Sequence, residues 1–187
     1  MEGNSCKSDG KEGGIEFSKI SLRPFNPSDV DDIMEWATDE KLARFSSWGH
    51  HTSKEEVLNF MMNVIIPHPW FKAICLDDKP IGEISVTGKS GNDKCRAEIG
   101  YILASKYWGK GIATYAVKLV ANDIFWEWPH LERLEALADV ENLASQRVLE
   151  KAGFQREGIL RKYYKMKGKT SDMVMFSLLF DDLSQSS

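Results

Sequence analysis

The chain has 187 residues, of which 42% are hydrophobic, and its formal net charge is −4. This length suits one domain with a sizeable core, and the acidic balance argues against a nucleic-acid-binding protein, which normally carries excess basic residues. The odd number of cysteines, three, argues against a disulfide framework. Neither a secretion signal nor an apolar run of membrane-spanning length is visible, so we expect a cytoplasmic protein without a membrane partner, the nucleus being a second compartment to consider.

The N-terminal third predicts a tail, a strand and two helices. Residues 1–16 have the composition of a disordered tail, and residues 17–184 are expected to form a single domain. A strand is expected over residues 20–24, and Asn26 is typical of a helix start. The sequence from Ser53 to Glu56 has the capping-box pattern that opens a second helix. The apolar face expected on this second helix consists of Val57, Phe60, Met61, Val64 and Ile65.

The remainder of the chain alternates strands and helices. Residues 70–76, 81–87 and 95–104 predict three strands joined by polar turns, which indicates antiparallel hairpins. A helix follows and ends near Glu127, before a strand over 131–140 that must be parallel to 95–104, since a crossover helix separates the two. A helix after Asn142 and two strands, 156–165 and 173–180, complete an α+β domain. We expect a mixed, mostly antiparallel sheet of about seven strands with helices on both faces.

The most informative stretch, residues 101–114, leads from a strand through Gly109 and Gly111 into a helix N-terminus. Backbone N–H groups at a helix start lack intrahelical partners, and the helix dipole adds partial positive charge there. Glycine lets a ligand approach the main chain, so this turn predicts a phosphate or pyrophosphate site. The spacing fits neither a Walker A loop nor a Rossmann fingerprint, which would have a third glycine at Thr114. A tight turn without a ligand is the alternative.

Three motifs resemble those of one superfamily. Residues 108–113, Trp-Gly-Lys-Gly-Ile-Ala, resemble the Gln/Arg-x-x-Gly-x-Gly/Ala signature of the GNAT superfamily, the acyl-CoA-dependent N-acetyltransferases, with Trp108 in place of Gln or Arg. Residues 142–154 resemble the second hallmark of that family, an Asn-initiated helix that ends in Lys-x-Gly-Phe. Residues 157–164 and 168–172 resemble the C-terminal part of the ribosomal-protein N-terminal acetyltransferase branch. The resemblance extends from about residue 20 to residue 183 and implies the GNAT fold.

The resemblance implies acetyl-CoA as co-substrate and a set of residues that bind it. Main-chain amides of residues 109–114 would hold the pyrophosphate, and Thr114 could add its hydroxyl. In the family the two parallel strands beside the crossover helix splay apart, so the main chain of Tyr101 and Leu103 would contact pantetheine and the acetyl carbonyl, with Leu103 as an oxyanion-type donor. The expected cofactor-binding residues are Tyr101, Leu103, Trp108, Gly109, Lys110, Gly111, Ile112, Ala113, Thr114, Asn142 and Ser145.

Two side chains are candidates for proton chemistry. We expect the Ser145 hydroxyl to donate a hydrogen bond to the departing sulfur, because this chain has Leu149 where many family members have a tyrosine general acid. A solvated serine in the first helical turn is the alternative. Glu98 is the expected base, and Glu83 on the preceding strand is a second candidate. Either glutamate could equally be a strand carboxylate without catalytic function.

The absence of a compelling base favours an acceptor amine of low pKa. Deprotonating an α-amine at pH 7 costs about 1–1.4 kcal/mol, against about 4.6 kcal/mol for a lysine side chain. We therefore expect a protein or peptide N-terminus as substrate, admitted between residues 45–52 and the hairpin at 163–169. A small amine, such as a polyamine or aminoglycoside, and a CoA-binding sensor without turnover are the alternatives. No metal is expected, because His50 and His51 lack a third ligand, and monomer and homodimer both stay open.

Overall fold

The computed structural model describes residues 15–45, 53–166 and 168–183. Most of the expected tail, residues 1–14, lies outside this part. Ile15 belonged to that tail in our prediction, but it packs against the main hydrophobic core. The short 3₁₀ helix η1 (Phe17–Lys19) begins two residues later, with Glu16 as its N-cap. The packed part of the chain therefore includes Ile15, which the composition had assigned to the tail.

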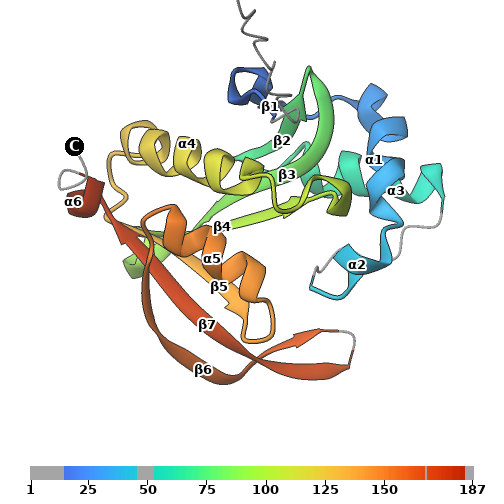
Figure 1. Cartoon of the computed structure of the whole chain (residues 1–187). Helices are drawn as coiled ribbons and strands as arrows, with labels where there is room; N and C mark the ends of the chain where they lie inside the picture. The colour runs from blue at the N-terminus through green and yellow to red at the C-terminus, as the bar shows by residue number, and fades with distance from the viewer. Residues whose placement is uncertain (1–14, 46–52, 167, 184–187) are drawn as a thin grey trace, which may run out of the picture.

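Seven strands form one sheet in the order β1-β2-β3-β4-β5-β7-β6 (Figure 1). Neighbouring strands are antiparallel except β4 and β5, which are parallel. This architecture confirms the predicted α+β class and its mixed, mostly antiparallel sheet. The strands are β1 (Ile20–Pro24), β2 (Phe71–Leu76), β3 (Lys79–Gly88), β4 (Arg96–Leu103), β5 (Arg133–Asp139), β6 (Gln155–Met166) and β7 (Lys169–Leu179).

Helices cover both faces of the sheet, because alternate residues of a strand point to opposite sides. Ala73 and Cys75 of β2 belong to a core cluster with α1 and α3, whereas Ile74 belongs to the larger cluster that contains α4. None of the described helices is both long and apolar enough to cross a bilayer. The helices are α1 (Val30–Ala37), α2 (Glu40–Ala43), α3 (Lys54–Phe60), α4 (Ile112–Glu127), α5 (Leu143–Lys151) and α6 (Phe180–Leu183), with short 3₁₀ helices η2 (Pro27–Asp29), η4 (Gly91–Asp93) and η5 (Ser105–Tyr107).

The helix that starts with a capping box departs from regular α-geometry at its C-terminal end. Ser53 Oγ accepts a hydrogen bond from the Glu56 N–H at 3.2 Å, as predicted. After α3, however, the chain continues as a π-helix, η3 (Met61–Ile65). The i→i+5 bonding of a π-helix widens the turn, so the buried residues Val57, Met61 and Ile65 repeat at intervals of four. Val64, which we expected on the apolar face, is 44% exposed.

The two parallel strands pair over only part of their length. Residues 96–98 of β4 pair with residues 133–135 of β5, and the two strands then diverge while β4 continues to Leu103. The expected splay is therefore present. It opens toward the start of α4, which follows β4 through the glycine turn.

The backbone of β4 presents polar groups to this opening. In an antiparallel pair, hydrogen bonds to one neighbour come from alternate residues. The Ala104 N–H donates to Ile81 O at 2.9 Å, so even-numbered residues at this end of β4 bond to β3. The N–H groups of Tyr101 and Leu103 consequently point to the side from which β5 has separated.

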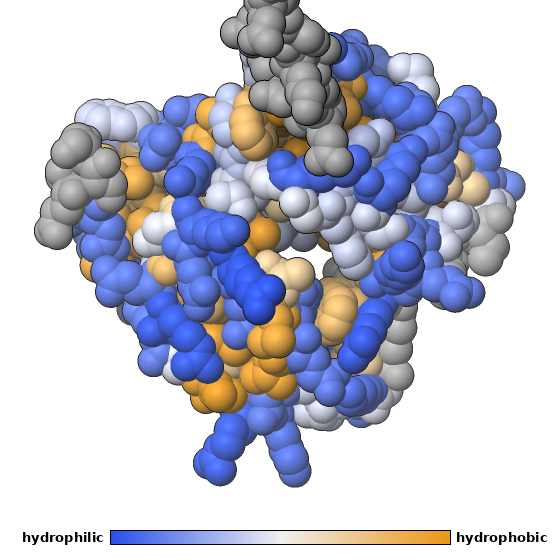
Figure 2. Space-filling model, in the orientation of Figure 1, coloured by the Kyte–Doolittle hydropathy of each residue, from blue (hydrophilic) through white to orange (hydrophobic). Residues whose placement is uncertain are grey.

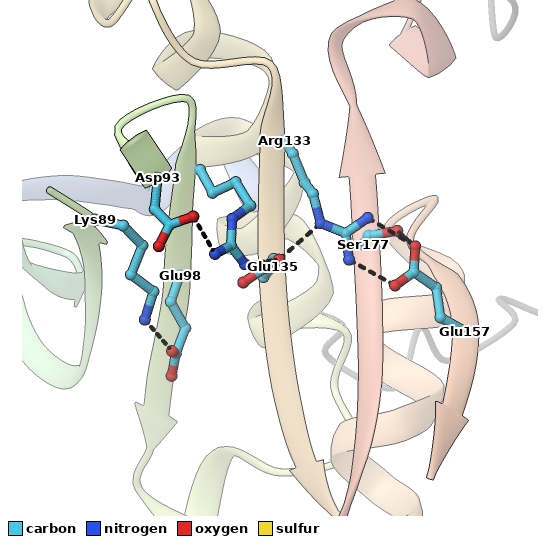
Figure 3. Close-up of polar contacts among 8 residues, drawn as sticks. Lys89, Asp93, Glu98, Arg133, Glu135, Glu157 and Ser177 are labelled. Carbon is cyan, nitrogen blue, oxygen red and sulfur yellow. Dashed lines mark hydrogen bonds and ion pairs between the residues drawn. The ribbon is translucent and has the colours of Figure 1, made fainter. Parts of the chain in front are cut away.

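A network of charged side chains joins four strands at the closed end of the splay (Figure 3). The buried carboxylate of Glu135 accepts hydrogen bonds from Arg96 at 3.0 Å and from Arg133 at 2.7 Å. Arg133 also donates to Glu157 at 2.7 Å, and the Ser177 hydroxyl donates to the same carboxylate at 2.7 Å. Burial alone would raise the pKa of Glu135, but the hydrogen bonds from Arg133 and Arg96 outweigh it and lower the pKa.

This network predicts a pH-dependent contribution to stability. Hydrogen bonds from Arg133 and Ser177 lower the pKa of Glu157 from 4.5 to about 2. A carboxyl group whose pKa is lower in the folded state stabilises the fold above pH 4.5, and this stabilisation is lost as the pH falls from 4.5 to about 2. Glu157→Gln should reduce the free energy of unfolding at pH 7 by roughly 1 kcal/mol, since the Glu157 side chain is 42% exposed and solvent screens the pair.

Urea denaturation of both proteins between pH 7 and pH 2 measures this difference, which should shrink as the pH falls below 4.5. Glu150→Gln, at an exposed position of α5, is the matched control and should change the unfolding free energy little. A constant difference over the whole range would mean that the Glu157 charge does not contribute.

Candidate functional site

A cavity of about 600 Å³ lies where β4 ends, α4 begins and α5 begins. The surface is visibly hollowed between α4 and α5 in the space-filling view (Figure 2). The splayed strand, the glycine turn and the Asn142 helix thus meet at one place. Of the expected cofactor-binding residues, the cavity wall includes Tyr101, Leu103, Trp108, Gly109, Gly111, Ile112, Ala113, Thr114, Asn142 and Ser145.

The glycine turn has the backbone geometry of a phosphate-binding loop. Gly109 and Gly111 have φ angles of 74° and 79°, in the left-handed region that favours glycine. Gly111 is the N-cap of α4 and has no side chain with which to cap it, so the N–H groups of the first turn stay available at the cavity. Lys110 differs from its neighbours, because its ammonium group lies 5.6 Å from the centre of the Tyr107 ring and its side chain is not part of the cavity wall.

Trp108 stands at the position where the signature that residues 108–113 resemble has Gln or Arg. Its indole N–H donates to Leu103 O at 2.6 Å, which ties the glycine turn to the end of β4. This bond uses the carbonyl of Leu103 and leaves its N–H directed into the splay. A donor at that position could stabilise negative charge on a carbonyl oxygen bound between the strands.

Ser145 lies in the first turn of α5, and two other side chains hold it there. Asn142 Oδ1 accepts a hydrogen bond from the Ser145 N–H at 3.1 Å, so Asn142 is the N-cap of α5. The Ser145 hydroxyl lies 2.8 Å from the Tyr101 hydroxyl, which is also 3.2 Å from Ser145 O. Burial raises the pKa of Tyr101, and the hydrogen bond with Ser145 only partly opposes this effect. The phenol therefore stays protonated at neutral pH.

The side chain of Tyr101 is a site residue that the sequence did not reveal. Only its main chain was expected to matter, since β4 and α5 are separate segments and no sequence pattern reports the distance between them. The structure places the phenol against Ser145, although the tyrosine position common in the family holds Leu149, which is 1% exposed in the core. A tyrosine from β4 thus reaches the first turn of α5.

Glu98 is not brought to the cavity. It pairs with Glu135 at the last position where β4 and β5 remain hydrogen-bonded, which is the closed end of the splay. Its carboxylate accepts a hydrogen bond from Lys89 at 3.0 Å (Figure 3). Our expectation of a catalytic base at Glu98 is therefore not supported by its position. Glu83 is not part of the cavity wall either, but it is buried on β3 opposite Ile102, which does line the cavity.

Cations on the cavity wall are a second feature that the sequence did not indicate. Arg147 and Lys151 lie four residues apart on α5 and so share one face of the helix. Lys41 and Arg44 approach from α2 and the residue after it. These four side chains suit a ligand that carries several phosphate groups, with Glu141 as an acidic neighbour 3.4 Å from Arg44.

The expected amine entrance is described only in part. Residues 46–52, with both histidines, lie outside the described residues. On the opposite side, Tyr163 and Tyr164 are exposed on β6 and are not part of the cavity wall. Lys169 at the start of β7 lies 3.7 Å from the carboxylate of Glu141, which does line the cavity. The described residues contain no group of three or more His, Cys, Asp or Glu side chains that could hold a metal ion.

Comparison with known proteins matches residues 19–155 to the Acetyltransferase (GNAT) domain. An N-acetyltransferase of Bacillus licheniformis called p20 is 30% identical over 166 residues, which cover 86% of this chain and 93% of the relative. The structure of the ribosomal-protein-S5-alanine acetyltransferase of Vibrio fischeri superposes on this chain with a TM-score of 0.76 at 25% identity. The match covers 91% of this chain and 98% of the Vibrio fischeri chain. RimL, a ribosomal L7/L12 α-N-protein acetyltransferase solved with coenzyme A, shares the fold, with a TM-score of 0.77 at 21% identity over 88% and 96% of the two chains.

Proposed function

Because this chain belongs to the GNAT acetyltransferase family and is thereby an acetyl-CoA-dependent N-acetyltransferase, we propose that its acceptor is the α-amine of a protein or peptide N-terminus. The main support for acetyl transfer is that three features lie at one cavity: the start of α4, the side of β4 that does not pair with β5, and the Ser145 hydroxyl. The residues present fit coenzyme A, since left-handed glycines, unpaired N–H groups and cations suit its phosphates.

In the proposed mechanism, the first turn of α4 binds the pyrophosphate, and the N–H groups of Tyr101 and Leu103 hold the pantetheine and the acetyl carbonyl. The amine nitrogen attacks the thioester carbonyl, and Leu103 N–H donates to the oxyanion that forms. Collapse of the tetrahedral species breaks the C–S bond, and the electron pair leaves on sulfur. Ser145 donates a hydrogen bond to that sulfur, while the Tyr101 hydroxyl can donate to Ser145 Oγ and keep the serine proton directed at the leaving group. Glu83 is our candidate to accept the proton that the amine loses.

Two arguments support an α-amine. The first is energetic: the single carboxylate on the described cavity wall, Glu141, is paired with Arg44 and Lys169, and an α-amine needs only about 1–1.4 kcal/mol to lose its proton at pH 7. The second is similarity, because the Vibrio fischeri relative is named for an alanine of ribosomal protein S5. A lysine side chain would require several kcal/mol more from the site.

Peptides with one end blocked test this proposal. A peptide with a free N-terminus and acetylated lysines should release CoA thiol in the presence of enzyme and acetyl-CoA, whereas its partner with an acetylated N-terminus and free lysines should not. The pH profile of kcat/KM should rise with a limb near the pKa of the α-amine, about 7.7–8.0, and flatten above it. Equal turnover of both peptides, or turnover of polyamines and aminoglycosides alone, would overturn the assignment.

A further inference from the structure

The β6–β7 hairpin has a charge opposite to that of the whole chain. Residues 155–172 contain six basic and two acidic residues, in a chain whose net charge is −4. Both acidic side chains are engaged within the domain: Glu157 bonds to Arg133 and Ser177, and Asp172 Oδ1 accepts a hydrogen bond from the Lys162 N–H at 2.7 Å. In the described part of the hairpin, Lys169 alone among the cations is in an ion pair. The exposed cations therefore have charge available for a partner.

A β-bulge in β6 contains two of these cations, Arg161 and Lys162. Leu160 pairs with Met173 and Tyr164 pairs with Ser171, so three residues, 161–163, face the single residue Asp172. We expected a regular strand here. Lys162 has a φ angle of 51°, which is rare for a residue other than glycine. The hydrogen bond from Lys162 N–H to the Asp172 carboxylate holds this conformation.

The bulged residues are displayed at the edge of the sheet. β6 is the last strand in the sheet order, so one side of its backbone faces solvent. Arg161, Lys162 and Tyr163 are all exposed, Tyr163 by 54%. Bulges often re-aim side chains beside active sites, and an observed backbone outlier is a reason to look for a function.

The hairpin also adjoins the cavity. Lys169 at the start of β7 approaches Glu141, and Glu141 lies on the cavity wall beside Arg44. In register, Lys165 lies opposite Thr170, next to Lys169 at the same end of the hairpin. A chain whose first residue occupies the cavity can therefore leave it along these cations.

We propose that Arg161, Lys162, Tyr163, Lys165 and Lys169 form a docking surface, here named the basic hairpin surface, for an acidic stretch of the acceptor polypeptide that follows its N-terminal residue. The proposal rests on the proposed α-amine function and specifies its substrate class. Arginine and lysine make charge-assisted hydrogen bonds to carboxylates, and the exposed Tyr163 ring adds contact area. A polypeptide is favoured over a nucleic acid because the surface adjoins the cavity in which the N-terminal residue of the acceptor is proposed to bind, so the following residues of the same chain reach these cations.

The test compares two peptides with the same free N-terminal residues, one continuing with Asp and Glu and the other with Ser and Gln. The parent enzyme should show a KM about tenfold lower for the acidic peptide at a similar kcat. Raising the salt from about 0.05 M to about 0.5 M should remove this preference, because exposed charges are screened. The variant with Arg161→Glu and Lys165→Glu should lose the preference while it acetylates the neutral peptide as the parent does.

A control variant with Lys94→Glu and Lys118→Glu has the same change in net charge at exposed positions outside the cavity and the hairpin, and it should keep the preference. Equal KM values for both peptides in the parent would overturn the docking surface and leave the α-amine proposal intact. Absence of turnover with either peptide would instead count against the α-amine. An oligonucleotide that displaces the acidic peptide at lower concentration than the peptide binds would assign the surface to nucleic acid and overturn the proposal.

Discussion

Replacing Ser145 by alanine is expected to lower kcat about 10- to 100-fold while the KM for acetyl-CoA changes little. A hydrogen bond to a charged group contributes roughly 1.5–3 kcal/mol, and the negative charge on sulfur develops only as the C–S bond breaks. The serine hydroxyl is held for this task by Asn142 at the helix start and by the Tyr101 phenol at 2.8 Å. Single-turnover measurements of CoA release would isolate the chemical step.

Two companion variants separate catalysis from packing. Ser145→Thr keeps a hydroxyl and should recover part of the lost rate. Tyr101→Phe removes the phenol but leaves Ser145 free to donate, so its effect on kcat should be smaller than that of Ser145→Ala. If Ser145→Ala turns over as fast as the parent when chemistry is rate-limiting, Ser145 is a residue of the first helical turn without a role in the reaction.

Gly111→Val should weaken CoA binding at least about tenfold, which corresponds to about 1.4 kcal/mol. Valine is strained at a φ angle of 79°, so the turn must change its backbone conformation and its N–H groups must move. A Cβ atom at this position would also lie 3.3 Å from Cζ of Phe17, which stacks on Tyr115. Titration calorimetry with CoA measures the change directly.

The contact with Phe17 calls for a control. Adding Phe17→Ala to Gly111→Val removes the steric conflict but not the backbone strain, so CoA binding should stay weak in the double variant. Gly91→Val places the same residue at a similarly left-handed position, with φ at 63° and open space around it, in η4. It should leave CoA affinity unchanged. Parental affinity in the double variant would assign the loss to Phe17 rather than to the phosphate-binding turn.

The elements with strong local signals were predictable. The helix after the glycine turn begins at Ile112 and ends at Glu127 as the pattern indicated, because glycine and proline mark its limits. Features set by unusual hydrogen bonding were not. The π-helix that turns Val64 outward and the bulge at residues 161–163 depend on how neighbouring segments pack, and apolar spacing does not report either.

For the candidate site, too, features with a local sequence signal were predictable, and features that depend on contacts between distant segments were not. Contiguous motifs located the turn at 109–114 and the N-cap Asn142, since their spacing is fixed along the chain. The position of Glu98 away from the cavity wall could not be foreseen, because the sequence shows that two strands are parallel but not where their pairing stops. The role of the Tyr101 phenol was missed because its hydrogen-bond partner, Ser145, belongs to another element, 44 positions away in the sequence.

The incomplete pairing of β4 with β5 has a consequence for the molecule as a whole. The sheet consists of two blocks, β1–β4 and β5–β7–β6, whose strands pair through only three residue pairs, at the end that also holds the ionic cluster. One hydrophobic core packs against both blocks. At the other end of β4, the cavity between β4 and α5 takes the place of strand pairing. A ligand bound in this cavity contacts both blocks at the end where no backbone hydrogen bonds join β4 to β5. The supply of acetyl-CoA would then govern how well the enzyme resists heat and proteolysis, as well as how fast it works.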